Sequence, residues 1–558
     1  MADVEAVAPP LKVDQEDEGV EVLRKRTLGN VRLRHLHTNE IILIPTPSKD
    51  PNDPLNWQAY VPPQWYKWYI ATVICLAMMM CNFLAAGPSI VIVRTTMSFF
   101  PGANPATDPA FFTTAIGKVS YFFTSAALLQ GVGNFFWVPV ANKFGRRPTY
   151  VLSYVIYTAC AIWLIFDHSF NGFLAGRILM GFGAGAAETI APVTIADIFF
   201  LHERGTVMAL YTAFLSVGVG FGMIICGLIT IDHDWRVIYQ VASAMIGFVL
   251  LLAFFTFPET AYIRERQPLV DDGHRQPSSA GEKSDVVATS DVEHSPEPIP
   301  PKESYLSSLK IFHRTLTDES FLKLVLRPLG LICLPPVLWA ALVESVTIGF
   351  LVAVTSNVDV AFQAAYGFES WQVGLCFISA CIGSILGIPA GGHLGDMTAD
   401  WFTKRNGGIR DPEMRLPAMI PCLITTPLAL ILYGVGIEHK LHWICPTIGL
   451  GLLNFSIVQG TNICLVYVID AYRPVAGEVT LAVMGFKSMF GFLLSFYTNT
   501  WVAKSGYQEA YGIMAAISAF IILLFVPLFI WGKQIRHVTW SWPVISYIHW
   551  DDDREVGE

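Results

Sequence analysis

Twelve apolar runs of roughly 20 residues alternate with short polar segments along the chain. A helix of that length crosses about 30 Å of hydrocarbon, and within lipid a lone strand would leave backbone groups unpaired. The pattern predicts an all-α integral membrane protein with twelve transmembrane helices in two pseudo-symmetric six-helix halves. The expected spans are 67–93, 113–141, 149–167, 172–200, 206–230, 237–257, 329–353, 370–395, 416–437, 442–469, 479–502 and 509–532.

The segment between the sixth and seventh runs is polar and rich in proline and serine, so it cannot bury a core. Behind it, SLKIFHRTLTDESFLKLVL spaces apolar residues as in a helix lying along the membrane surface, although more linker is the alternative. The expected organisation is a cytoplasmic N-terminal tail (1–66), an N-terminal six-helix bundle (67–261), a cytoplasmic linker, disordered and then helical (262–328), a C-terminal six-helix bundle (329–532) and a cytoplasmic C-terminal tail (533–558).

The distribution of charged residues supports a membrane protein and predicts its orientation in the bilayer. Charged residues make up only 15% of the chain, against about 25% in soluble proteins. Lysine and arginine gather in alternate links, which by the positive-inside rule are cytoplasmic and place both ends in the cytoplasm. These links hold Lys143, Arg146, Arg147, Arg204, Lys404, Arg405, Arg410, Arg415 and Arg473.

Several functional classes find no support in the sequence. No basic surface indicates nucleic-acid binding, and the ten cysteines lie in or beside apolar runs without metal-ligand spacing. No nucleophile with its base and no phosphate-binding loop is recognisable, so we expect neither an enzyme nor a bound cofactor or metal. Any transport by this chain would then be driven by a gradient and not by hydrolysis.

The link after the second run carries Val138-Pro139-Val140-Ala141-Asn142-Lys143-Phe144-Gly145-Arg146-Arg147-Pro148. It resembles the signature loop of the major facilitator superfamily, G-x-x-x-D-x-x-G-R-R. That resemblance implies a cytoplasmic gate in which an ion-pair latch holds helices together. Val138 replaces the glycine and Asn142 replaces the aspartate, so we expect this half to close less firmly.

The matching link of the second half contains Gly392-His393-Leu394-Gly395-Asp396. Gly392 and Asp396 reproduce the part of the motif that the first half lacks. Paired motifs at corresponding positions indicate an internal repeat, which is typical of transporters built from related halves.

The fourth run contains Arg177, Gly181, Gly185 and Glu188. Arg177 and Glu188 differ by about 20° around a helix, so both share a face with the small glycines. This resembles the superfamily motif whose arginine is associated with proton transfer, although Arg177 could instead snorkel to the membrane surface. A charge inside a membrane helix usually faces the protein interior or a water-filled cavity.

Glu188 lies near the middle of the fourth run, and Glu344 lies near the middle of the seventh. Helices four and seven border the central cavity in the superfamily fold, so we predict a proton or cation site at these carboxylates. The alternative for each is a protonated glutamate that serves only packing. The amides Asn82, Gln130, Gln459 and Asn462 also lie at mid-depth, as ligand contacts or as packing groups. Lys118 and Lys487 lie nearer helix ends and are expected to snorkel.

The fifth run contains Gly218, Gly222 and Gly227 at helical spacing. They resemble the glycine-rich motif of drug:proton antiporters, in which proline normally follows the second glycine. Met223 stands there instead, which weakens the inference of export; simple close packing is the alternative. Asp50-Pro51-Asn52-Asp53-Pro54-Leu55-Asn56-Trp57 and Phe257-Pro258-Glu259-Thr260 resemble the fungal branch of the twelve-spanning family, over roughly residues 45–535.

These patterns predict a proton-coupled secondary transporter of a small organic solute, monomeric and in the plasma membrane, with the lipid bilayer around it. The resemblance favours efflux of drugs, toxins or metabolites. Uptake of organic cations such as polyamines is the first alternative, and a non-transporting sensor of the same fold is the second.

Overall fold

The computed structural model describes residues 31–32, 50, 52–56, 65–102, 108–262, 307, 309–312, 315–317, 319–540 and 542. Almost all of these residues are helical. One short ribbon pairs β1 (Val31–Arg32) antiparallel with β2 (Ile409–Arg410), so that Val31 faces Arg410.

Residues before the linker form one group of helices, which we call the N-group. Its elements are η1 (Pro54–Asn56), α3 (Trp65–Ala86), η2 (Gly87–Val91), α4 (Ile92–Phe99), α5 (Pro109–Val132), α6 (Asn134–Phe144), α7 (Arg146–Phe166), α8 (Phe170–Ile198), α9 (Leu201–Ile229) and α10 (Val237–Thr256).

Residues after the linker form the C-group. Its elements are α12 (Phe321–Leu331), α13 (Pro335–Glu344), the π-helical turn η3 (Ser345–Gly349), α14 (Phe350–Tyr366), α15 (Ser370–Cys376), α16 (Ile378–Gly391), α17 (His393–Arg405), η4 (Pro412–Met419), α18 (Ile420–Glu438), α19 (Ile444–Ala471), η5 (Arg473–Val475), α20 (Ala476–Leu523) and α21 (Phe525–Trp540).

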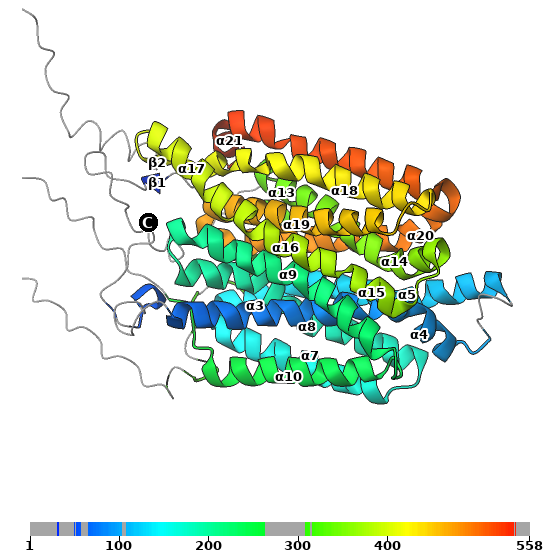
Figure 1. Cartoon of the computed structure of the whole chain (residues 1–558). Helices are drawn as coiled ribbons and strands as arrows, with labels where there is room; N and C mark the ends of the chain where they lie inside the picture. Colours follow the sequence, from blue (N-terminus) through cyan, green and yellow to red (C-terminus); the bar gives the residue numbers. More distant parts are fainter. Residues whose placement is uncertain are drawn as a thin grey trace, which may run out of the picture.

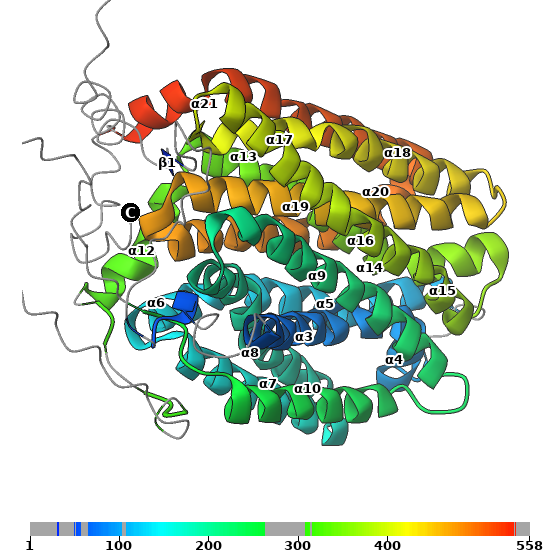
Figure 2. The same ribbon diagram turned by 60° about the vertical axis from the view of Figure 1, so that its left-hand side comes forward.

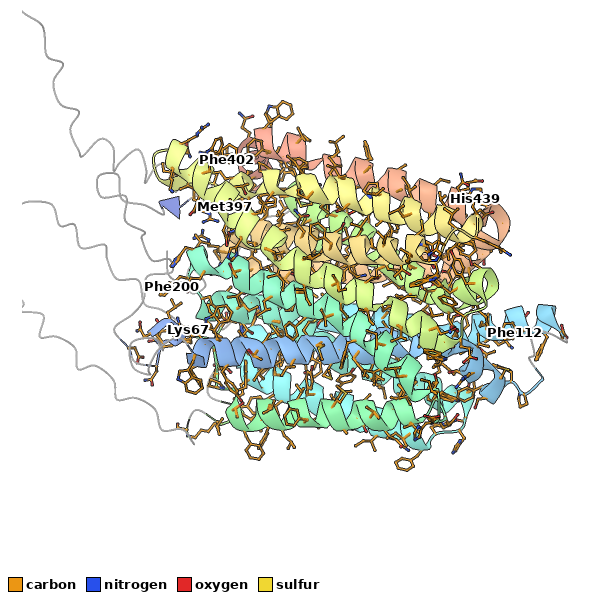
Figure 3. The ribbon with its side chains drawn as sticks, in the orientation of Figure 1. Lys67, Phe112, Phe200, Met397, Phe402 and His439 are labelled. Carbon is orange, nitrogen blue, oxygen red and sulfur yellow. The ribbon has the colours of Figure 1, made fainter. Side chains whose placement is uncertain are left out.

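The long helices of both groups run side by side, and α9 lies between them next to α16 and α19 (Figures 1 and 2). The bundle has two ends. One carries Lys67, Phe200, Met397 and Phe402, and we call it the α17 face (Figure 3). The other carries Phe112 and His439 and lies near α4, so we call it the α4 face.

Ten helical stretches of the described residues are long and apolar enough to cross a membrane. The expected number was twelve, and the difference lies at two places. The stretch Arg473–Trp540 is 68 residues long and is interrupted at Gly506, where φ is 78°. The apolar pair α5 and α6 is divided at Gly133 and is not among the ten. Twelve spans therefore stay a prediction.

Two helices begin later in the chain than expected. The predicted amphipathic helix begins only at Phe321, after Ser320 caps it by accepting a bond from the Lys323 amide at 3.3 Å. Upstream, the Leu316 amide donates to the Lys143 carbonyl at 2.9 Å, so this segment is bound to the last turn of α6 and does not continue the helix. The seventh span starts at Pro335 instead of 329, because α12 ends at Leu331. Linker residues 263–306 lie outside the described residues.

Glycines bring α8 directly against α5. A Cβ atom at Gly181 would collide with the Ala126 carbonyl, and one at Gly185 would collide with the Gln130 carbonyl. Small residues permit this approach of two helix backbones in a membrane protein. The close contact fixes the depth and direction of Gln130 and Glu188, two side chains of the candidate site.

Candidate functional site

A cavity of about 110 Å³ lies between the two groups of helices. Its lining comes from α3, η2, α5, α8 and α9 of the N-group and from η3, α14 and α20 of the C-group. Most lining groups are apolar or hydroxylated. From Glu188 the lining continues to Ser89 on η2 and to Thr355 and Ser356 on α14, so the cavity extends toward the α4 face.

Glu188 and Lys487 both line the cavity, and they form an ion pair that joins the two groups. The other Glu188 oxygen accepts a hydrogen bond from Gln130 Nε2 at 3.1 Å. Lys487 is only 5% exposed, so the expectation that it snorkels is wrong. An ammonium in an apolar interior needs a counter-charge, and Glu188 on α8 supplies it.

Glu344 is fully buried but does not line the cavity. It is the last residue of α13, where the chain widens into the π-helical turn η3. Neither of its carboxylate oxygens has a hydrogen-bond partner among the described residues. The charges of Lys487 and Glu188 nevertheless act on it, which places the three groups in one electrostatic cluster.

The four mid-depth amides divide into two pairs. Asn82 and Gln130 line the cavity, where Gln130 Nε2 lies 3.4 Å from Asn82 Oδ1 and Asn82 Nδ2 donates to the Leu215 carbonyl at 3.3 Å. Gln459 and Asn462 do not line it. They donate to the carbonyls of Ala418 and Gly205, at 2.8 and 3.4 Å, and so pack helices.

Arg177 is completely buried and does not line the cavity, although it donates to the carbonyl of the lining residue Ala85 at 3.4 Å. Its guanidinium donates to the Phe122 carbonyl at 2.9 Å and the Leu84 carbonyl at 2.8 Å, and it stacks 5.0 Å from the Phe123 ring centroid. It therefore does not snorkel. These contacts join α8 to the end of α3 and to α5.

The glycines of α9 permit close packing against two neighbours. A Cβ atom at Gly218 would lie 2.6 Å from the Met79 carbonyl oxygen, and one at Gly222 would lie 2.7 Å from that of Phe83, both on α3. A Cβ atom at Gly227 would lie 3.1 Å from the carbonyl oxygen of Ser370, on α15 of the C-group. Met223 is buried, and its sulfur lies 3.8 Å from the Ser89 hydroxyl at the cavity.

The predicted gate lies at the α17 face. Gly145 turns the chain with φ 107°, and Arg146 donates to Asn142 Oδ1 at 3.2 Å and pairs with Asp197 at 3.1 Å. Asp197 on α8 thus gives Arg146 a carboxylate partner within the N-group. Glu259 is a second carboxylate at this turn. It accepts hydrogen bonds from the backbone amides of Arg146 and Arg147, at 2.8 and 3.2 Å, at the start of α7.

The C-group copy of the gate contains an ion pair between Asp396 and Arg415, with 2.7 Å between Oδ1 and Nη2. Gly392 lets α16 approach α9, since a Cβ atom at Gly392 would lie 3.1 Å from Ala209 Cβ.

Nearby, Arg204 of α9 pairs with Asp470 of α19 at 3.4 Å, and this ion pair joins the two groups. Sequence reasoning missed Asp197, Arg204, Asp470 and Lys487 as partners, since they are distant in sequence from the motifs.

Cross-group contacts occur on both sides of the cavity. Toward the α17 face, Asn462 Nδ2 of α19 donates to the Gly205 carbonyl of α9 at 3.4 Å, next to the Arg204–Asp470 pair. Toward the α4 face, the Ser89 hydroxyl donates to the Thr355 carbonyl at 3.3 Å. A cavity between two groups of helices, with an ion pair across it, matches the position of the binding site in membrane transporters built from related halves.

The chain belongs to the Major Facilitator Superfamily, whose family model matches residues 70–495. It is 25% identical over 540 residues to an uncharacterized MFS-type transporter of Schizosaccharomyces pombe, covering 90% of this chain and 89% of that protein. It is also 25% identical over 404 residues to a probable efflux pump, mfs2, of Aspergillus flavus, covering 71% of this chain and 89% of that protein.

Among solved structures, the proton:xylose symporter XylE of E. coli shares the fold, with a TM-score of 0.56, 16% identity and coverage of 86% of this chain and 99% of that one. The chain is therefore an integral membrane protein and a secondary transporter that acts on a small molecule. Its family consists of transporters and not of enzymes.

Proposed function

We propose that the chain is a proton-coupled carrier of a small organic solute, with efflux as the favoured direction and Glu188 as the proton or cation site. The observation that carries this proposal is the Glu188–Lys487 pair at the cavity. An ion pair across two helix groups breaks when they separate. A proton or cation bound at Glu188 therefore changes the free energy of that separation, which is the requirement for coupling.

The orientation we propose places the α17 face and both ends of the chain in the cytoplasm, in the plasma membrane and as a monomer. The support is the distribution of basic residues. Arg146, Arg147, Arg204 and Arg415 all belong to links at this face. Cytoplasmic links of membrane proteins carry an excess of such residues.

A second candidate is uptake of organic cations. Its support is the cavity carboxylate together with Met223, which stands where the antiporter motif has proline. The direction of transport is determined by measuring flux in vesicles in which the orientation of the protein is known. With a proton gradient directed from the α4 side to the α17 side, accumulation of the cation on the α17 side would favour uptake, whereas accumulation on the α4 side would favour efflux.

The test of proton coupling uses purified full-length protein in liposomes with a trapped pH-sensitive dye and an imposed pH gradient. The probes are radiolabelled spermidine and tetraphenylphosphonium. We expect Glu188→Gln to lower proton-dependent flux of the transported probe by at least tenfold, because a neutral amide neither binds a proton nor pairs with Lys487.

The matched control is Glu509→Gln, which makes the same chemical change on an exposed residue outside the cavity. It should retain the flux of the unsubstituted protein. Equal reconstitution of both variants is checked by protein content of the liposomes. Full proton-dependent flux in Glu188→Gln would exclude Glu188 as the coupling site.

A further inference from the structure

The Lys487 ammonium occupies a position that a ligand in the cavity would compete for. Both partners of the Glu188–Lys487 pair face the cavity, and the Lys487 side chain reaches Glu188 from α20 of the opposite group. Gln130 holds the second Glu188 oxygen at 3.1 Å, which fixes the carboxylate. The pair thus describes a subsite for a primary ammonium, filled in this structure by the protein's own lysine.

A second buried carboxylate, Glu344, lies on a helix that packs against the helix of Lys487. Glu344 belongs to the C-group, as Lys487 does, and the helices α13 and α20 that carry them pack against each other. The Glu344 oxygens have no hydrogen-bond partner among the described residues, although the side chain is fully buried. The π-helical turn that follows Glu344 departs from regular helix at this point, a feature frequent at functional sites.

The titratable groups around this cluster come from several elements. Lys487 approaches from α20, Glu188 from α8, Tyr211 from α9 and Cys464 from α19. Tyr211 donates its hydroxyl to the Glu188 carbonyl at 2.6 Å. Lys487 is thus the only cation that these interactions place beside the two carboxylates within the described part of the chain.

We propose that Lys487 is a tethered counter-ion that exchanges between Glu188 and Glu344, and that the ligand is a cation whose ammonium group takes its place at Glu188. This rests on the proposed transport function and names its substrate class. Pairing with Glu188 joins the two groups of helices, whereas pairing with Glu344 lies within the C-group. Binding of the cation would therefore remove an ion pair that holds the groups together.

The exchange is tested by the thermal stability of purified full-length variants in detergent, followed by tryptophan fluorescence. Glu188→Gln and Glu344→Gln each leave one carboxylate for Lys487, so each should lower the apparent melting temperature only slightly. The double variant leaves a buried ammonium without a counter-ion and should lose more than the sum of the two shifts. Adding Lys487→Met to the double variant should restore most of the loss.

Asp359 provides the matched control, because it is a buried carboxyl on α14 that is influenced by Arg94 and not by Lys487. Glu188→Gln with Asp359→Asn should show additive shifts. Additive shifts for Glu188→Gln with Glu344→Gln, or no restoration by Lys487→Met, would overturn the exchange. Absence of flux in the unsubstituted protein would overturn the proposed transport function. The melting temperatures do not depend on flux, so the two outcomes can be told apart.

The ammonium subsite is tested with n-butylammonium, which matches the lysine side chain, and with n-butyrate as an anion of similar size. In Lys487→Ala, where the side chain no longer fills the subsite, millimolar n-butylammonium should raise the melting temperature by several degrees. It should not do so in Lys487→Ala with Glu188→Gln, and n-butyrate should not do so in either. An equal shift with and without Glu188, or no shift at all, would contradict the subsite.

Discussion

Individual charged residues of this protein have different roles although they all lie within apolar helices. Glu188 and Lys487 face the cavity, whereas Arg177 is enclosed by backbone carbonyls. Burial of a charge is tolerated in both cases because a partner compensates it. The kind of partner separates the two roles: a side chain that a ligand can displace at Glu188, and fixed carbonyls at Arg177.

We expect Arg177→Lys to destabilise the protein by about 2–3 kcal/mol, the size of charge-assisted hydrogen bonds lost in a buried site. Lysine cannot reproduce the planar contacts to the Phe122 and Leu84 carbonyls and the Phe123 ring. The measurement is the melting temperature in detergent, with flux per folded molecule recorded alongside. Flux should remain near that of the unsubstituted protein.

Lys118→Met is the control, since Lys118 is exposed and should have little effect on stability. A proton-transfer role for Arg177 makes the opposite prediction. Arg177→Lys would then keep its melting temperature and lose proton-dependent flux, which would contradict the structural role assigned to this residue.

At the scale of residues, the sequence permits part of the site to be predicted. Glu188 is recognisable because a carboxylate in the middle of an apolar run is costly and therefore rarely accidental. Lys487 is not recognisable, because it lies 299 residues from Glu188 and a lysine near a helix end usually snorkels. The orientation of Glu344 depends on the π-helical turn after it, which regular helical periodicity does not reveal.

At the scale of elements, the packing of α8 against α5 determines the geometry of the site. Gly185 is the contact point, and the Gln130 carbonyl occupies the space that a side chain would need. Hydropathy predicts that both helices exist, since apolar runs in lipid form helices. It predicts neither the break at Gly133 nor the start of α12 at Phe321, because those depend on contacts with distant segments.

Gly185→Ala should therefore separate α8 from α5 and lower stability, by about 1–3 kcal/mol as for other overpacked interiors. The shift also moves Gln130 away from Glu188, so flux should fall even in the folded fraction. Gly117→Ala is the matched control on α5, because a Cβ atom there meets nothing within 4 Å. Melting temperature and flux are measured for both. Equal effects of the two substitutions would show that the α5–α8 contact is not critical.

At the scale of the whole molecule, an ion pair at the α17 face joins the two groups of helices. Motif comparison predicts a weakened gate because Asn142 lacks a charge, and the Arg146–Asp197 pair lies within the N-group and does not join the two groups. The pair that joins the groups directly is Arg204 with Asp470, and both side chains are about 6% exposed. Its contribution is larger than that of a surface pair because solvent screens it less.

Asp470→Asn should favour opening of the α17 face, since Arg204 loses its counter-charge across the interface while its bond to the Ala196 carbonyl remains within the N-group. A change of 1–2 kcal/mol alters the ratio of closed to open molecules by about 5- to 30-fold. The opening is measured as the distribution of distances between two spin labels, attached at Trp65→Cys and Met397→Cys, which are exposed at this face. Cys333, Cys381 and Cys445 are replaced by serine so that they are not labelled.

The longer distances should gain population in Asp470→Asn. Asp400→Asn, which changes a more exposed carboxylate within the C-group, should leave the distribution unchanged, and an identical response of both variants would show that the Arg204–Asp470 pair does not control closure.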